Sequence, residues 1–158
     1  MSSSSDTIAR TATLTLHGPL AEVFPLFGPV REAEWAAGWS PRFVGGAPAE
    51  IGEHLVFVTP AHGPGEPDYV WTLAQYAPER GFIEYSVFTP ERVWWVTVRC
   101  RAAGQNTTAE ITYTYTALTP HGAARNAHAL AAMFAHDLKD WERAINHYLA
   151  TGTQLAHQ

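Results

Sequence analysis

The clearest pattern along the chain is a long amphipathic segment near its end, Ala123 to Leu149. At about 100° per residue, its apolar side chains fall within one quadrant of a helical wheel. The apolar stripe comprises Leu130, Phe134, Leu138, Trp141, Ile145 and Tyr148, and the opposite face carries His136, Asp140, Arg143 and His147. A single helix with so apolar a face needs a second layer to bury it, so we predict a long C-terminal helix packed on a sheet.

The residues before this helix alternate between apolar and polar side chains, which is typical of half-buried strands. We predict strands at Thr11–His17, Leu55–Thr59, Tyr69–Tyr76, Phe82–Phe88, Val93–Arg101 and Ala109–Leu118, and Arg42–Val44 would add a seventh. The five strands from Leu55 to Leu118 are consecutive and are joined by short turns containing Pro, Gly or Asn, which favours an antiparallel meander. Two short helices follow the first strand, one from Pro19 and one over Pro29–Ala37, with Gly38 placed as a left-handed cap.

Charged residues indicate which face of each strand meets water. Arg99, Arg101, Glu84 and Glu110 cannot face a core unpaired, so we expect them to point to water. Side chains alternate along a strand, so the residues one or three positions away should point inward. The predicted inward residues are Ile83, Tyr85, Val87, Trp94, Val96, Val98, Cys100, Ile111, Tyr113 and Tyr115, and we add Phe57, Trp71 and Leu73 from the earlier strands.

These elements predict an α+β fold in which a curved antiparallel sheet of six to seven strands surrounds one long helix. The 158 residues suit a single domain, which we place at residues 7–152, with an unstructured start at 1–6 and a flexible tail at 153–158. No segment resembles a secretory signal or a membrane span, and Cys100 is the only cysteine, so we expect a cytoplasmic protein.

Charge narrows the range of partners. The net charge is −5, and the ten basic residues are scattered rather than clustered. Nucleic acid and anionic membrane surfaces are therefore poor candidates, because both select for a basic patch. The composition leaves a small-molecule ligand or a second protein copy as the partners to consider.

Several short motifs occur along the chain. Residues 23–27 read Val-Phe-Pro-Leu-Phe, and Glu32 and a Trp-x-x-Gly-Trp at 35–39 follow. Residues 113–118 read Tyr-x-Tyr-Thr-Ala-Leu, and 141–149 read Trp-Glu-x-x-Ile-Asn-x-Tyr-Leu. These motifs resemble those of bacterial proteins in the START-like superfamily, also called SRPBCC or helix-grip proteins, which includes polyketide cyclase-dehydrases and lipid-transport proteins. The resemblance implies the helix-grip fold and an internal cavity between sheet and helix rather than a particular reaction.

The predicted interior is unusually aromatic, which suits a flat, apolar ligand. The candidate ligand-binding residues are Trp35, Trp39, Phe57, Trp71, Tyr85, Trp94, Tyr113, Tyr115, Met133 and Phe134. We expect Trp35 and Trp39 at the cavity entrance and the loop His62–Pro67 as a lid. The alternative interpretation is that these rings simply fill the space between helix and sheet.

Two acids are candidates for proton transfer. Asp137 lies at the edge of the apolar stripe, where it would be either partly buried and usable as an acid or base, or a boundary residue that reaches water. Glu32 would guard the cavity mouth, or merely favour the positive first turn of its helix.

No motif predicts a metal or a cofactor. His136 and His147 are too far apart on the helix to chelate together, and no His-x-x-x-His pair is present. There is no Gly-x-Ser-x-Gly elbow, and the glycines at 45, 46 and 52 fit no nucleotide-binding fingerprint.

Three functions remain open. The first is binding of a small hydrophobic, aromatic or lipid-like molecule in the cavity. The second is a polyketide-cyclase-like enzyme that uses acid and base groups in the cavity. The third is an interaction module of the chaperone-activator type, for which Phe82, Phe88 and Trp95 on the predicted outer face would supply an apolar patch or a homodimer contact.

Overall fold

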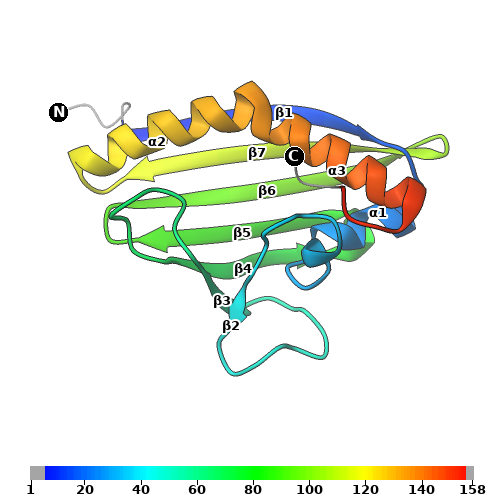
Figure 1. Ribbon diagram of the computed structural model, residues 1–158, viewed down its shortest axis with the longest axis horizontal. Coiled ribbons are helices and arrows are strands. Elements are labelled where there is room, and N and C mark those ends of the chain that lie inside the picture. The colour runs from blue at the N-terminus through cyan, green and yellow to red at the C-terminus, as the bar shows by residue number, and fades with distance from the viewer. Residues whose placement is uncertain (1–5, 156–158) are drawn as a thin grey trace.

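The computed structural model describes residues 6–155, and in it seven antiparallel strands form one curved sheet in the order β1-β7-β6-β5-β4-β3-β2 (Figure 1). The strands are β1 (Thr7–Leu16), β2 (Arg42–Phe43), β3 (Val56–Thr59), β4 (Tyr69–Ala77), β5 (Phe82–Thr89), β6 (Arg92–Ala103) and β7 (Asn106–Ala117). The predicted meander is confirmed from β2 to β7, and β1 then pairs with β7 along its whole length. The short strand expected at Arg42–Val44 is the edge strand β2.

The connection between β1 and β2 is less helical than predicted. It contains the single turn α1 (Leu20–Val23) and the 3₁₀ turns η2 (Phe24–Phe27) and η3 (Arg31–Glu34). Two short helical segments do follow β1, as predicted, but the second, expected over Pro29–Ala37, is only the 3₁₀ turn η3. Trp35 explains the difference: its indole turns inward, donates to the carbonyl of Leu26 at 2.7 Å and ends the turn. Gly38 does take the predicted left-handed conformation, with φ of 83°.

The long C-terminal helix runs along the sheet beside β7 and β1 (Figure 1). It consists of α2 (Pro120–Ala132), the π-helical turn η5 (Met133–Asp137) and α3 (Leu138–Thr151). Thr119 caps the start by accepting a hydrogen bond from the backbone N–H of Gly122 at 2.9 Å, with Pro120 in the first helical position. Our prediction of one uninterrupted α-helix missed η5, in which the N–H of Leu138 bonds five residues back to Met133.

Contacts with β1 fix the position of α3 on the sheet. The carboxylate of Glu142 accepts from the backbone N–H of Thr15 at 2.8 Å. Asn146 accepts from the N–H of His17 at 2.7 Å and donates to the carbonyl of Thr15 at 3.1 Å. These bonds satisfy backbone groups of β1 that no neighbouring strand reaches, so they hold the helix and the sheet edge together.

The predicted strand faces are confirmed, and the inward residues of β5, β6 and β7 are buried. A bulge between Leu73 and Gln75 then changes the parity of β4 and brings Tyr76 inward, where its ring stacks on Phe24 at 6.3 Å. Phe82 is on the outer face but is only 7% exposed, because the guanidinium groups of Arg80 and Arg99 cover its ring. The expectation that Phe82 contributes to an exposed apolar patch is therefore wrong.

The predicted unstructured start and tail fall largely on residues 1–5 and 156–158, which lie outside the described residues. Within residues 6–155, no helix is both long enough and apolar enough to cross a bilayer.

Candidate ligand cavity

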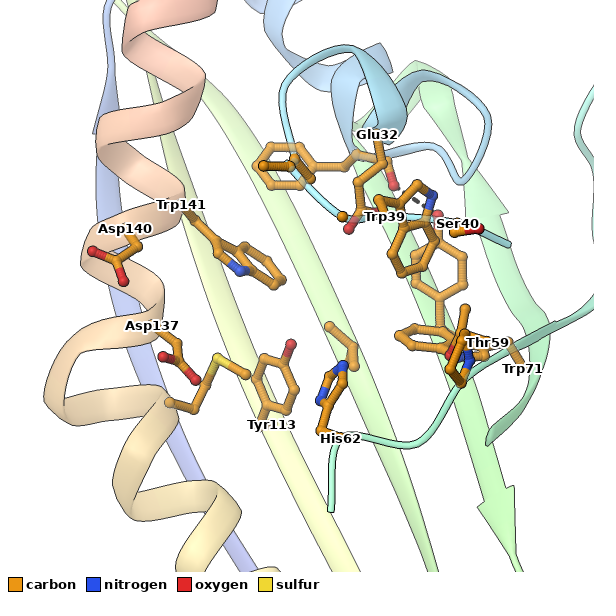
Figure 2. Close-up of a pocket in the computed structure, with 18 of the residues that line it drawn as sticks. Glu32, Trp39, Ser40, Thr59, His62, Trp71, Tyr113, Asp137, Asp140 and Trp141 are labelled. Atoms are coloured by element: carbon orange, nitrogen blue, oxygen red, sulfur yellow. Dashed lines mark hydrogen bonds between the residues drawn. The ribbon is translucent and has the colours of Figure 1, made fainter. Parts of the chain in front are cut away.

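Two adjoining cavities lie between the inner face of the sheet and the C-terminal helix. Their volumes are about 420 Å³ and about 640 Å³, and we call them cavity 1 and cavity 2. Both are lined by His62, Trp71, Tyr113, Met133 and Asp137, so the two spaces meet along one shared wall. Cavity 1 extends toward η3 and the following turn, and Figure 2 shows the residues around it. Cavity 2 extends toward α2 and the loop between β3 and β4.

Rigid aromatic rings form much of the wall of cavity 1. Trp39 donates its indole N–H to the carbonyl of Pro29 at 2.7 Å, and Trp71 donates to the hydroxyl of Thr59 at 2.9 Å. Tyr85 donates to the carbonyl of Phe27 at 2.6 Å. Because these polar atoms are already satisfied by the protein, the rings offer apolar surface and stacking contacts to a ligand.

Tyr113 differs from those rings, because its hydroxyl has no hydrogen-bond partner among residues 6–155. The residue lies on β7 and its hydroxyl reaches the shared wall of the two cavities (Figure 2). Burial, with the nearby Tyr115, Glu32 and Asp137 adding to it, raises the pKa of Tyr113 well above its usual value. Tyr113 therefore stays protonated and can donate one hydrogen bond to a bound molecule.

Glu32 is the most perturbed acid of the site. It lies on η3, lines cavity 1 and projects its carboxylate into the space between helix and sheet (Figure 2). No described residue donates a hydrogen bond to this carboxylate or pairs with it. Desolvation by burial raises the pKa of Glu32 from 4.5 to about 8. At neutral pH this carboxyl is largely protonated, which places a neutral hydrogen-bond donor and proton source in an aromatic cavity.

A second group of polar residues, which we call the Arg92 cluster, lines cavity 2 and the core beneath it. Glu66, in the loop before β4, receives two hydrogen bonds from Arg92 at 2.8 and 3.1 Å and one from Tyr69 at 2.8 Å. Arg125 of α2 lies 3.7 Å from the same carboxylate, and Asn126 accepts from Arg92 at 3.4 Å. The side chains of Glu66 and Arg92 are 1% and 5% exposed, so this is a buried ion pair.

The surroundings of the Arg92 cluster favour the charged form of Glu66. Burial acts to raise the pKa of Glu66, but hydrogen bonds from Arg92 and Tyr69 and the charges of Arg92 and Arg125 outweigh it, so the pKa is lowered. The guanidinium of Arg92 also lies over three aromatic rings, at 4.4 Å from Trp94, 5.6 Å from Tyr69 and 5.8 Å from Tyr115. Glu66 therefore remains ionised beside two arginines.

Comparison with known proteins relates this architecture to solved structures rather than to sequence families. No family model matches the chain, and no curated protein matches it in sequence. Norcoclaurine synthase from Thalictrum flavum superposes with a TM-score of 0.66 over 92% of this chain and 87% of that one, at 12% identity. The Zhui aromatase/cyclase from Streptomyces sp. R1128 gives 0.67 over 94% and 99%, at 16% identity, and Ara h 8.0201 gives 0.65 over 92% and 99%, at 13% identity.

The chain has the START-like helix-grip fold. This confirms the fold that the sequence motifs implied. At these sequence identities the likeness concerns the fold alone, so the chemistry of cavities 1 and 2 follows from the residues that line them.

The helix-grip cavities include most of the residues that the sequence proposed for ligand contact. Cavity 1 is lined by Trp39, Trp71, Tyr85, Tyr113 and Met133, and cavity 2 by Trp71, Trp94, Tyr113, Tyr115 and Met133. Glu32 lines cavity 1 and Asp137 lines both. The loop His62–Pro67 covers cavity 2, but Glu66 ties it to Arg92, so it is anchored rather than a free lid.

Three proposed ligand contacts do not reach either cavity. Trp35 is 2% exposed, bonds to the backbone of η2 and packs edge-on against Trp141. Phe57 is fully buried beneath the ring of Trp71, at 5.4 Å. Phe134 turns toward β1, where the guanidinium of Arg10 lies 4.9 Å from its ring. These placements correct our expectation, because each of the three rings packs against the protein itself.

Sequence reasoning missed the Arg92 cluster and Trp141 as parts of the site. Arg92 shares the parity of Trp94 and Val96 on β6, so the face argument that we applied to Arg99 would have placed it inward. Glu66 carried no such signal, because it lies in an irregular loop. Trp141 was included in the apolar helical stripe, and the structure places it at the wall of cavity 1.

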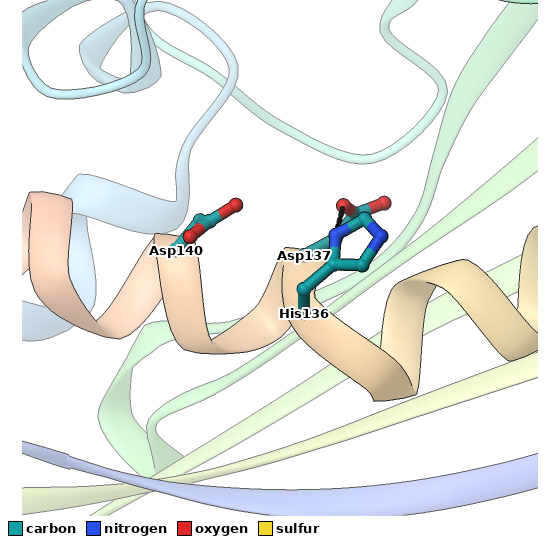
Figure 3. Close-up of side chains that lie close together, drawn as sticks. All are labelled: His136, Asp137 and Asp140. Atoms are coloured by element: carbon teal, nitrogen blue, oxygen red, sulfur yellow. Dashed lines mark ion pairs between the residues drawn. The ribbon is translucent and has the colours of Figure 1, made fainter. Parts of the chain in front are cut away.

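The helix also brings His136, Asp137 and Asp140 close together, with potential ligand atoms within 4.8 Å of one another (Figure 3). His136 and Asp137 form an ion pair at 2.7 Å, and Asp140 pairs with Arg143. The side chain of Asp137 is 40% exposed, so it occupies the boundary position rather than a buried one. Because all three side chains have salt-bridge partners and face solvent, the group resembles a solvated ion-pair network more than a metal centre.

Proposed function

We propose that this protein binds a small hydrophobic molecule, with an aromatic group, in the cavities between the sheet and the C-terminal helix. The observation that carries the proposal is the wall of cavity 1, in which Trp39, Trp71, Tyr85 and Trp141 present ring surface. Volumes of about 420 and 640 Å³ fall within the range of about 300–1,000 Å³ that is common for small-molecule sites. Tyr113 and Glu32 add the few polar groups that orient a ligand.

Two features support binding over the other interpretations. The hydrogen bonds that fix Trp39, Trp71 and Tyr85 hold the rings in place before a ligand arrives, which reduces the entropy cost of binding. The chaperone-activator alternative requires a filled interior, and two cavities weigh against it. Val70 and Phe88, which are paired on the outer face, are 37% and 48% exposed and could form a homodimer contact. Light scattering, which measures the mass of the protein in solution, distinguishes a monomer from a dimer.

The binding proposal can be tested with the neutral fluorescent probe N-phenyl-1-naphthylamine. We expect saturable enhancement of its fluorescence, and Trp71→Leu should weaken binding about tenfold by removing one wall of both cavities. Trp95→Leu is the matched control, because Trp95 lies on the outer face of β6 and lines neither cavity. Absence of binding by the wild type, or equal loss in both variants, would reject the proposal.

Acid–base catalysis is a second candidate function, and Glu32 is the observation that favours it. A carboxyl with a pKa of about 8 can both give and take a proton near neutral pH. The hydroxyl of Tyr113 lines the same cavity and can donate to a carbonyl oxygen as charge develops there. Two of the structurally similar proteins are a synthase and an aromatase/cyclase, which supports this candidate by analogy of fold.

Exchange of the α-protons of 1-tetralone in deuterated water tests this second candidate. We expect the wild type to accelerate exchange, Glu32→Gln to abolish the acceleration, and Glu34→Gln to retain it. Glu34 is a suitable control because it lies on the same turn but pairs with Arg31 outside the cavity. No acceleration by the wild type, or equal rates in both variants, would remove Glu32 from an enzymatic role.

A further inference from the structure

The Arg92 cluster contains more hydrogen-bond donors than acceptors. Its carboxylate, Glu66, already accepts from Arg92 and Tyr69, and the carbonyl of Pro64 accepts from Arg125 at 3.2 Å. Two buried donors have no partner among residues 6–155, the Nε of Arg125 and the Nδ2 of Asn126. Unsatisfied buried donors are costly, so the cluster as it stands lacks an acceptor.

The Arg92 cluster also contains more positive than negative charge. Two guanidinium groups face one carboxylate, which leaves one net positive charge at the wall of cavity 2. The other titratable residues that line the cavity are three tyrosines, Tyr69, Tyr113 and Tyr115, three histidines, His62, His121 and His128, and one acid, Asp137, at the junction with cavity 1. Asp137 contacts His136 at 2.7 Å, and among residues 6–155 it forms no salt bridge with Arg92 or Arg125.

The two arginines have different surroundings. Arg92 is held by a two-point contact with Glu66 and by the faces of three aromatic rings, so it is committed to the protein. Arg125 makes only a 3.7 Å approach to Glu66 and one bond to a loop carbonyl, and its side chain is 19% exposed at the cavity wall. Arg125 is therefore the cation that remains available to a bound molecule.

We propose that cavity 2 accepts the acidic group of an aromatic carboxylic acid and that Arg125 is its recognition residue. This inference rests on the proposed binding function and narrows it to an amphipathic ligand. The aromatic part occupies the ring-lined space of cavity 1 and the shared wall of Trp71 and Tyr113, and the carboxylate points toward α2. The carboxylate of the ligand then supplies the negative charge that the cluster lacks and accepts hydrogen bonds from the guanidinium of Arg125, which lines the cavity.

The test compares 2-naphthoate with 2-naphthamide, which has the same ring and no charge, by isothermal titration calorimetry. We expect the wild type to bind 2-naphthoate at least about tenfold more tightly than the amide, because one charge-assisted contact has about this effect. Arg125→Met should remove this preference by weakening the binding of 2-naphthoate more than that of the amide. Arg125→Lys should keep part of the preference, since it keeps the charge but not the paired N–H groups.

Arg143→Met is the matched control, because it removes an equivalent charge from the exposed face of α3 away from the cavities. Thermal melting of each variant checks that folding is retained. Equal affinity of the wild type for acid and amide would overturn the inference but leave the proposed function standing. If Arg125→Met weakens the binding of acid and amide equally, the inference is also overturned and the proposed function still stands. If neither naphthalene binds, the proposed function fails as well.

Discussion

Replacing Glu32 by glutamine should stabilise the protein against unfolding as the pH rises. Glutamine has the shape of the protonated carboxyl but cannot ionise, so it avoids the cost of a buried charge. Burial raises the pKa of Glu32 from 4.5 to about 8 in the folded protein. Between these two values the unfolded chain releases the proton and the folded protein retains it. The contribution of Glu32 to stability is therefore largest below pH 4.5 and is lost as the pH rises toward 8.

The size of the effect follows from the pKa difference. A rise from 4.5 to about 8, at about 1.4 kcal/mol per pH unit, sets an upper limit of about 5 kcal/mol. Solvent that enters the cavity can hydrate the ionised carboxylate and lowers this limit. We expect the glutamine variant to be about 2–3 kcal/mol more stable than the wild type at pH 8 and equal to it near pH 4.5.

Urea unfolding, followed by tryptophan fluorescence at a series of pH values, measures the difference directly. Glu34→Gln is the control, and it should show the opposite sign. Hydrogen bonds from Arg31 and Tyr148 lower the pKa of Glu34, so its contribution is present above pH 4.5 and is lost as the pH falls. A stability difference between wild type and Glu32→Gln that does not change with pH would show that the carboxylate is well solvated, and the reasoning would fail.

Three further substitutions or modifications test other parts of the structure. Gly122→Ala should lower the melting temperature, at a cost of about 2 kcal/mol or more, because its Cβ would overlap the backbone carbonyl of Glu91; an unchanged melting curve would contradict this. Arg92→Met should cost up to about 3–5 kcal/mol, because buried Glu66 then keeps only the hydrogen bond from Tyr69 and Arg125 at 3.7 Å, and Arg92→Met/Glu66→Met should recover part of this; no recovery in urea unfolding would refute the buried-charge argument. Cys100 should resist a disulfide reagent until the protein unfolds, because burial raises the pKa of its thiol to about 12; rapid labelling of the folded protein would contradict it.

The sheet was predictable because each central strand contains a charged residue that marks its solvent face. Glu84, Arg99 and Glu110 each identify a solvent face, and strict alternation then fixes every other side chain on that strand. The same logic located the rings of Tyr85, Trp94 and Tyr113 before their positions were known. The resemblance in the motifs around Glu32 and Trp39 supplied the rest of the architecture.

The remaining features depend on contacts that a linear pattern does not record. The helical wheel assumes a constant angle per residue, and η5 breaks that assumption at Met133. Trp35 and Trp39 look equivalent in sequence, yet one bonds to Leu26 inside the core and the other lines cavity 1. Arg92 and Glu66 are 26 residues apart, and only the folded sheet brings them within bonding distance.

The wide turn at η5 has a consequence for how the C-terminal helix tolerates changes in length. Upstream of it α2 is capped at Thr119, and downstream α3 is bound to β1 through Glu142 and Asn146, so each half is positioned by its own partners. The five-residue spacing absorbs one residue that a regular helix could not accommodate. Deleting Ala135 should therefore convert η5 to regular α-helix and leave both halves on their anchors, whereas deleting one residue within α3 would rotate the residues on one side by about 100°. The π turn thus uncouples the rotation of α2 from that of α3, so each helix keeps the orientation that its own contacts require.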